Sequence, residues 1–125
     1  MKIIDAIALC DDLKANSYDY EHKLAWLSKL DLMIQRSIID VHEGGGDAEC
    51  CGYDADTDER TELLAPAPFD AMYLHWLKAQ IDLENGDYAK YNADIALFNA
   101  EYAAFENDYH RNHAPISSAA QRFIF

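Results

Sequence analysis

An aromatic row with helical spacing is the sequence feature that most constrains this fold. Seven apolar residues follow one another at alternating intervals of three and four positions: Tyr88, Tyr91, Ile95, Phe98, Tyr102, Phe105 and Tyr109. This period places all seven side chains on one face of an α-helix, whereas a strand needs alternation. A tyrosine ring buries a large area but keeps a hydroxyl that needs water or a partner. The helix is therefore expected at a boundary, half in a core or half in a protein interface.

The remaining apolar pattern predicts an all-α bundle of about four helices, over residues 3–14, 20–41, 69–85 and 88–112. The second helix carries a buried stripe of Leu24, Leu27, Leu30, Ile34, Ile38 and Val41, widened by Trp26 and Met33. The third carries a stripe of Phe69, Met72, Tyr73, Trp76, Leu77 and Ile81.

Helix ends are marked by local residues. Ser17 or Asp19 can cap the second helix by accepting a hydrogen bond from an unpaired N–H. Pro68 suits the first turn of the third helix, and Asp70 suits its positive end. The sequence Asn85-Gly86-Asp87 combines a helix stop, a tight turn and a helix start. So short a turn between two long helices predicts an antiparallel helical hairpin.

Charge and composition exclude several classes of partner. The 125 residues include 10 Lys or Arg against 23 Asp or Glu, for a net charge of −13, and 50% are hydrophobic. These values fit one domain with its own core. So acidic a surface repels phosphate, so binding to nucleic acid or anionic lipid is not expected. Without 18 consecutive apolar residues or a signal-peptide pattern, the chain is expected to be made and kept in the cytoplasm.

Residues 43–65 are predicted to form a long acidic loop, either mobile or ordered only by a neighbouring subunit. The alternating Asp54, Asp56 and Asp58 suggest an EF-hand calcium loop. The sixth position is Glu59 and the twelfth is Ala65, where that motif needs glycine and glutamate. A solvated acidic loop without a high-affinity calcium site is the better interpretation.

No catalytic or metal-binding pattern emerges from the sequence. Neither a phosphate-cradling glycine motif nor a nucleophile elbow is present. A zinc site can be assembled on paper from Cys50, Cys51, His42 and a distant histidine, but no C-x-x-C spacing supports it. Cys10 lies in an apolar helical stretch and is expected in the core. The chain is therefore expected to be neither an enzyme nor a holder of a cofactor or metal.

The last segment, residues 113–125, is expected to leave the helical domain of residues 1–112 as an extended C-terminal arm. Pro115 ends the preceding helix, and Phe123, Ile124 and Phe125 form an apolar end. Large apolar side chains are seldom left in water, so they are expected to dock on another protein chain. The alternative is that they fold back onto the domain's own core.

Several stretches resemble the head–tail connector proteins of tailed bacteriophages, also called adaptor or head-completion proteins. The resemblance spans residues 20–113, includes no catalytic signature, and lies in residues 23–31, 53–58, 61–70, 73, 79–82, 88–92 and 97–99.

The resemblance implies an α-helical subunit of a ring, usually of twelve copies, in the virion neck. The ring would bind below the portal, join head to tail through tail or neck proteins, and let DNA pass without specific binding. Candidate contact residues for neighbours are Trp26, Tyr53, Tyr88, Tyr91, Tyr102, Tyr109, Ile116, Phe123, Ile124 and Phe125. The alternative from another class is an intracellular helical adaptor or regulator that binds a single partner protein.

Overall fold

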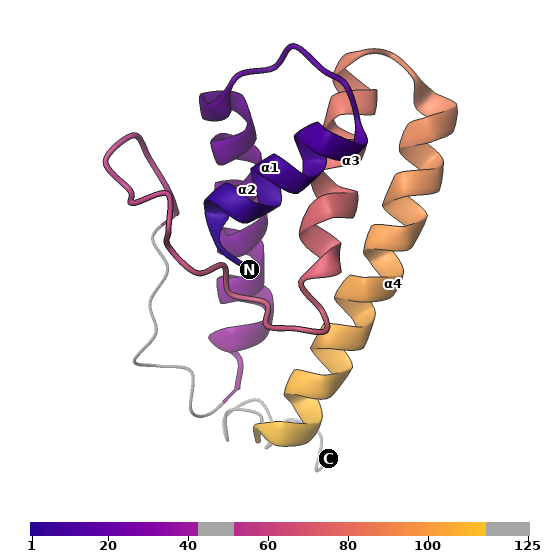
Figure 1. Cartoon of the computed structure of the whole chain (residues 1–125). Coiled ribbons are helices and arrows are strands. Elements are labelled where there is room, and N and C mark those ends of the chain that lie inside the picture. Colours follow the sequence, from indigo (N-terminus) through magenta and orange to yellow (C-terminus); the bar gives the residue numbers. More distant parts are fainter. Residues whose placement is uncertain (43–51, 115–125) are drawn as a thin grey trace.

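The computed structural model describes residues 1–42 and 52–114, and this part of the chain is an all-α bundle (Figure 1). Its elements are α1 (Ile3–Leu13), α2 (Tyr20–Ile34), the π-helical turn η1 (Gln35–Ile39), α3 (Ala71–Glu84) and α4 (Tyr88–Asn112). The prediction of four helices is confirmed. The proposed C-terminal arm from residue 115 onward lies outside the described residues.

The predicted helix ends are present at two places. Asp19 caps α2 by accepting a hydrogen bond from the backbone N–H of His22 at 2.9 Å. Gly86 has a φ of 76°, a left-handed conformation that glycine adopts without strain, and Asp87 caps α4 by accepting from the backbone N–H of Lys90. The short turn at Gly86 and Asp87 folds α3 and α4 into an antiparallel hairpin (Figure 1).

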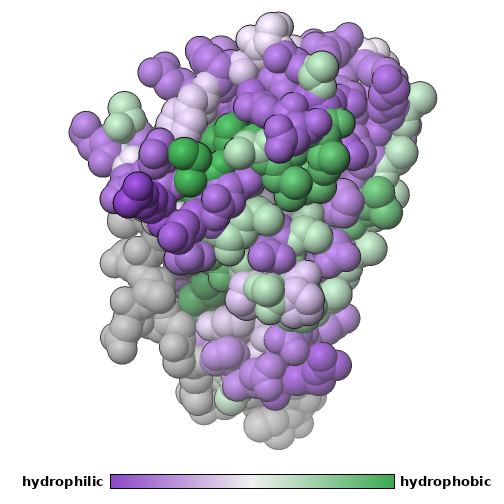
Figure 2. All heavy atoms as spheres, viewed as in Figure 1, coloured by the Kyte–Doolittle hydropathy of each residue, from purple (hydrophilic) through white to green (hydrophobic). Residues whose placement is uncertain are grey.

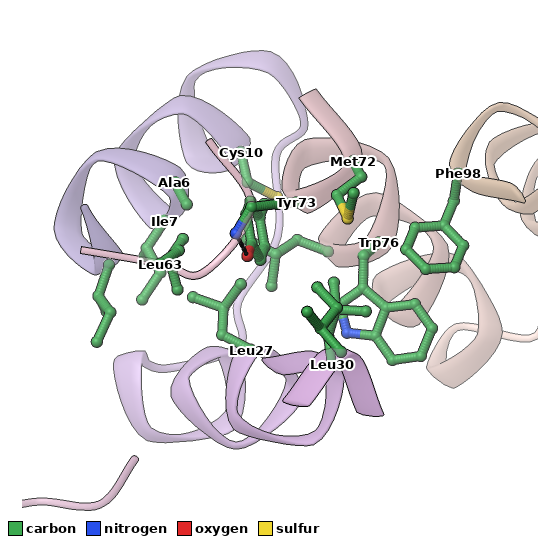
Figure 3. Close-up of a cluster of buried hydrophobic side chains, with 14 of the residues drawn as sticks. Ala6, Ile7, Cys10, Leu27, Leu30, Leu63, Met72, Tyr73, Trp76 and Phe98 are labelled. Atoms are coloured by element: carbon green, nitrogen blue, oxygen red, sulfur yellow. Dashed lines mark hydrogen bonds between the residues drawn. The ribbon is translucent and has the colours of Figure 1, made fainter. Parts of the chain in front are cut away.

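The core lies where α1, α2 and α3 meet. Figure 3 shows side chains from the three helices converging, with Cys10 from α1, Leu27 and Leu30 from α2, and Tyr73 from α3. All four are fully buried, which confirms the expectation for Cys10. Burial raises the pKa of the Cys10 thiol to about 11, so this cysteine remains a small apolar core residue.

Helix α4 contributes one face only. Phe98 and Phe105 are buried, and Phe98 packs against Trp76 with ring centroids 5.0 Å apart (Figure 3). Four other members of the aromatic row are half-buried: Tyr91, Ile95, Tyr102 and Tyr109. Tyr88 is 64% exposed because it is the first residue of α4, beside the connecting turn. The prediction of a helix at a boundary therefore describes the row from Tyr91 to Tyr109 and not Tyr88.

The second predicted helix differs from the structure in where it ends and in how wide its buried stripe is. Helix α2 ends at Ile34, and η1 continues it with a wider turn, which rotates the following residues relative to an α-helical register. Val41 is consequently 43% exposed, although Ile38 remains buried. Met33, which was expected to widen the buried stripe, is 37% exposed on the outer face.

The third predicted helix starts later than expected. Helix α3 begins at Ala71, so Pro68 precedes it in a turn and Asp70 is its N-cap residue without a side-chain cap bond. Phe69 lies before the helix and is half-buried against Phe105 of α4.

Candidate interaction surfaces

A buried carboxylate on α2 attaches the loop segment to the bundle. Asp31 is fully buried and accepts hydrogen bonds from the hydroxyl of Tyr73 at 2.6 Å, from the backbone N–H of Leu64 at 3.1 Å, and from the hydroxyl of Tyr53. The Tyr73 oxygen in turn accepts from the backbone N–H of Ala65 at 2.8 Å. Burial raises the pKa of Asp31, and the three donors offset part of that effect.

The same segment is also bound to the start of α1. The backbone N–H groups of Ile3 and Ile4 donate to the carbonyls of Thr61 and Glu59 at 3.0 and 2.9 Å, and Leu63 N–H donates to the Met1 carbonyl. Contacts within one chain therefore fix residues 59–65, and the expectation that only a neighbouring subunit orders this part of the loop was wrong. Local sequence propensity could not predict this attachment, because the hydrogen bonds join residues about 60 positions apart.

The acidic part of the loop forms its own turn. Asp54 accepts from the backbone N–H of Asp56 at 2.9 Å, and Asp58 accepts from the backbone N–H of Arg60 at 2.9 Å. The side chains of Asp54, Asp56 and Asp58 are exposed, and none lies within 4 Å of a cationic nitrogen of the described residues. Figure 1 shows this part of the chain projecting from the bundle beside α2. We refer to residues 54–58 as the acidic turn.

The chain reaches the acidic turn by passing very close to α2. Gly52 has a φ of 87°, and a Cβ built on it would lie 2.6 Å from Ser28 Oγ and 3.2 Å from a methyl carbon of Leu32. The same Ser28 Oγ accepts a hydrogen bond from the backbone N–H of Tyr53 at 2.9 Å. Only glycine permits both this conformation and this approach.

The outer face of α2 and η1 carries a shallow groove of about 540 Å³. Leu32 and Met33 provide apolar surface, while Lys29 and Arg36 add two cations seven positions apart. Ser28, the residue that binds Tyr53, lies at the groove as well. We call this the α2 groove; the sequence pattern assigned Met33 to the core and so did not predict it.

A second carboxylate cluster joins α1, α3 and α4. Asp82 and Asp94 are 2% and 8% exposed; Lys14 Nζ lies 2.6 Å from Asp82 Oδ1, and Lys78 Nζ lies 3.9 Å from Asp94 Oδ1. Burial and hydrogen bonding with Asp82 raise the pKa of Asp94 to about 6. Burial opposes ionisation of Asp82, but hydrogen bonding with Asp94 and the contact with Lys14 hold its pKa below its ordinary value.

Histidines gather where η1 approaches the end of α4. His42 Nδ1 lies 2.6 Å from the Ile38 carbonyl, and His42 Nε2 lies 3.2 Å from Nδ1 of His110. His113 stacks on Tyr109 with ring centroids 3.8 Å apart, and Tyr109 also meets His42 edge to face. The half-buried Tyr109 thus makes ring contacts with two histidines of its own chain.

The other predicted contact residues are dispersed. Trp26 is half-buried beside Tyr18, and its carbonyl accepts from the indole N–H of Trp76 at 2.8 Å. Tyr53, predicted as a partner contact, directs its hydroxyl to Asp31 of its own chain. Tyr88 and Tyr91 lie at the start of α4, far along the row from Tyr109. Outside the described residues lie the predicted contacts Ile116, Phe123, Ile124 and Phe125, and the cysteines Cys50 and Cys51.

Exposed apolar side chains also occur on α1. Figure 2 shows apolar atoms gathered over this helix, which carries the exposed Ile4, Leu9 and Leu13.

Within residues 1–42 and 52–114 no helix is both long and apolar enough to cross a bilayer. Over the same ranges no group of three His, Cys, Asp or Glu side chains is arranged to hold a metal ion.

Comparison with known proteins adds no family assignment. No family model matches the chain, and no match was found among curated proteins or solved structures.

Proposed function

We propose that this chain is a structural subunit of the phage neck, a head–tail connector that binds below the portal as a ring and joins head to tail. The observation that carries the proposal is the resemblance to the connector pattern, above all in residues 53–58, 61–70, 88–92 and 97–99. The role is structural, with no catalytic step, cofactor or metal. In this role the protein would be made in the host cytoplasm and reside in the virion.

Three properties of the chain support the proposal. The bundle is all-α, as the resemblance implies, and contains a long antiparallel hairpin. The net charge of −13 suits a surface along which DNA passes without binding. Exposed aromatic and apolar side chains, such as Tyr88 and Leu97 on α4, are available for contacts with neighbours.

The test is assembly with the portal protein encoded in the same genome. The two proteins are coexpressed, purified through a tag on the portal, and imaged by electron microscopy. The expected result is an additional ring of density below the portal, containing this chain. The portal expressed alone is the control.

A chain that does not copurify with the portal, and is absent from purified particles by mass spectrometry, would contradict the proposal. Recovery of one stoichiometric host or phage protein of another kind would then favour the alternative, an intracellular adaptor with a single partner.

A further inference from the structure

The α2 groove combines apolar surface with cations that have no partner in the described part of the chain. Five other basic side chains lie within 4 Å of an aspartate carboxylate, namely Lys14, Lys23, Lys78, Lys90 and Arg111. Lys29 and Arg36 form no such pair within residues 1–42 and 52–114, and both are exposed. Lys2 and Arg60 form none there either, but neither of them lines the α2 groove. On a chain with a net charge of −13, this is a local positive strip. Charge complementarity therefore favours an occupant that carries carboxylates.

The acidic turn has the opposite property. Its three carboxylates are exposed, and hydrogen bonds from neighbouring residues hold those of Asp54 and Asp58 in a defined arrangement. Tyr53, next to the turn, is bonded to Ser28 at the groove of the same chain, yet no carboxylate of the turn lies within 4 Å of Lys29 or Arg36. The turn and the groove are thus complementary in charge but unpaired within one chain.

We infer that the α2 groove binds the acidic turn of a second copy of this chain. Lys29 and Arg36 contact the carboxylates of Asp54, Asp56 and Asp58, while Leu32 and Met33 lie against Ala55. This inference rests on the proposed function in one respect, since it assumes that copies of the chain assemble. It explains how subunits that repel one another by net charge can still adhere, because opposite charges meet locally. The contact joins two different patches, so it can repeat from copy to copy around a closed ring.

Self-association of the full chain, measured by sedimentation velocity from micromolar to millimolar concentration, tests the contact. The double variant Lys29→Glu, Arg36→Glu is expected to lower the association constant by at least about tenfold. The matched control Lys90→Glu, Arg111→Glu makes the same change in net charge on α4 and should leave the constant within about twofold. Raising the salt to about 0.5 M should weaken wild-type association, because exposed charge pairs are screened.

A charge exchange makes the test specific. The triple variant Asp54→Lys, Asp56→Lys, Asp58→Lys should also fail to self-associate, because its turn repels its own groove. Mixing it with the groove variant should restore association, since the reversed turn now meets the reversed groove. Circular dichroism checks that each variant keeps its helices.

Three results would overturn the inference. They are a wild-type chain that stays monomeric throughout the range, a groove variant that associates like wild type, and a mixture that shows no rescue. Loss of portal binding in the groove variant with unchanged self-association would assign the groove to another protein and equally overturn it. Portal binding is scored separately: intact charge rescue without any portal binding contradicts the connector role and leaves the contact standing.

Discussion

Two buried carboxylate centres lie on different sides of α3 and are stabilised in different ways. Asp31 is satisfied by two tyrosine hydroxyls and a backbone N–H, with no cation within 4 Å among the described residues. Asp82 and Asp94 face Lys14 and Lys78. The first centre uses directional neutral donors, and the second uses charge.

The choice between neutral donors and cations corresponds to the part of the structure that each centre holds in place. The Asp31 centre joins a loop to a helix, and each of its bonds specifies the position of one backbone or hydroxyl group. The Asp82–Asp94 centre joins helices α1, α3 and α4, which apolar packing already brings together. Directional bonds thus position an irregular segment, whereas an ionic cluster adjusts packing that exists without it and responds to pH.

Replacing Asp31 should give the largest effect. Asp31→Ala leaves the Tyr73 hydroxyl, the Tyr53 hydroxyl and the Leu64 N–H without their acceptor in a buried site. We expect unfolding free energy to fall by about 3–5 kcal/mol, measured by urea denaturation. Cleavage by trypsin after the exposed Arg60 should also accelerate in the native state, because residues 59–65 lose their attachment.

The matched control is Asp12→Ala, which removes an exposed aspartate from α1 and should change stability by less than about 0.5 kcal/mol. A loss of under about 1 kcal/mol for Asp31→Ala would show that the backbone bonds to α1 hold the segment without Asp31.

Removing a cation from the second centre should have a smaller effect. Lys14→Met keeps the aliphatic stem but leaves the nearly buried Asp82 without its partner at 2.6 Å. We expect a loss of about 2 kcal/mol in unfolding free energy at pH 7. Lys90→Met is the control, because the Lys90–Asp87 pair is exposed and contributes little. Equal losses for the two variants would remove the distinction between the buried and exposed pairs.

The smallest expected change is a gain. Burial and Asp82 raise the pKa of Asp94 from 3.8 to about 6, so the folded state favours the protonated form. This contribution is present below about pH 4 and is lost as the pH rises through about 6. Asp94→Asn supplies at any pH an N–H that can donate to Asp82, whose Oδ2 has no donor when Asp94 is ionised. We expect the variant to be more stable than wild type by about 1 kcal/mol at pH 8, with a smaller difference at pH 5.

Thermal unfolding at the two pH values measures the effect. Glu106→Gln, which neutralises an exposed carboxylate on the same helix, should shift neither curve. If the Asp94→Asn variant were less stable than wild type at pH 8, the ion pair between Lys78 and Asp94 would stabilise the fold more than a hydrogen bond donated to Asp82 does.

The helical part of the fold was predictable because its signals are local. The stripe from Leu24 to Ile38 and the turn at Gly86 each follow from neighbouring residues. The end of α2 was not predictable, because Gln35 to Ile39 are compatible with an ordinary helix and no residue there signals a π-helical turn. Extrapolating helical periodicity past that turn misassigned Val41.

The carboxylate centres show where sequence reasoning stops. Asp31 lies four positions after Leu27 and three before Ile34, so a carboxylate within the buried stripe was a visible signal. Its partner Tyr53 was predicted as a contact with a neighbouring protein, and its partner Tyr73 was predicted as part of the apolar stripe of the third helix. Nothing in the sequence indicates that these two tyrosines, 20 residues apart, bind the same carboxylate. The α2 groove was missed because helical periodicity placed Met33 in the core, and nothing in the sequence distinguishes Lys29 and Arg36 from other cations on a helix surface.

The close approach at Gly52 has a consequence for how sequences of this kind can vary. Both Gly52 and Gly86 have positive φ, but a Cβ at position 86 would meet nothing within 4 Å. In a library of all single substitutions, position 86 should admit asparagine, which tolerates this conformation. Position 52 should admit glycine alone, because any side chain displaces Ser28 and with it the path of the chain toward the acidic turn. Among homologous sequences, an invariant glycine at position 52 would therefore reflect the close contact with Ser28. A position 86 that varies would reflect only the requirement for a positive φ.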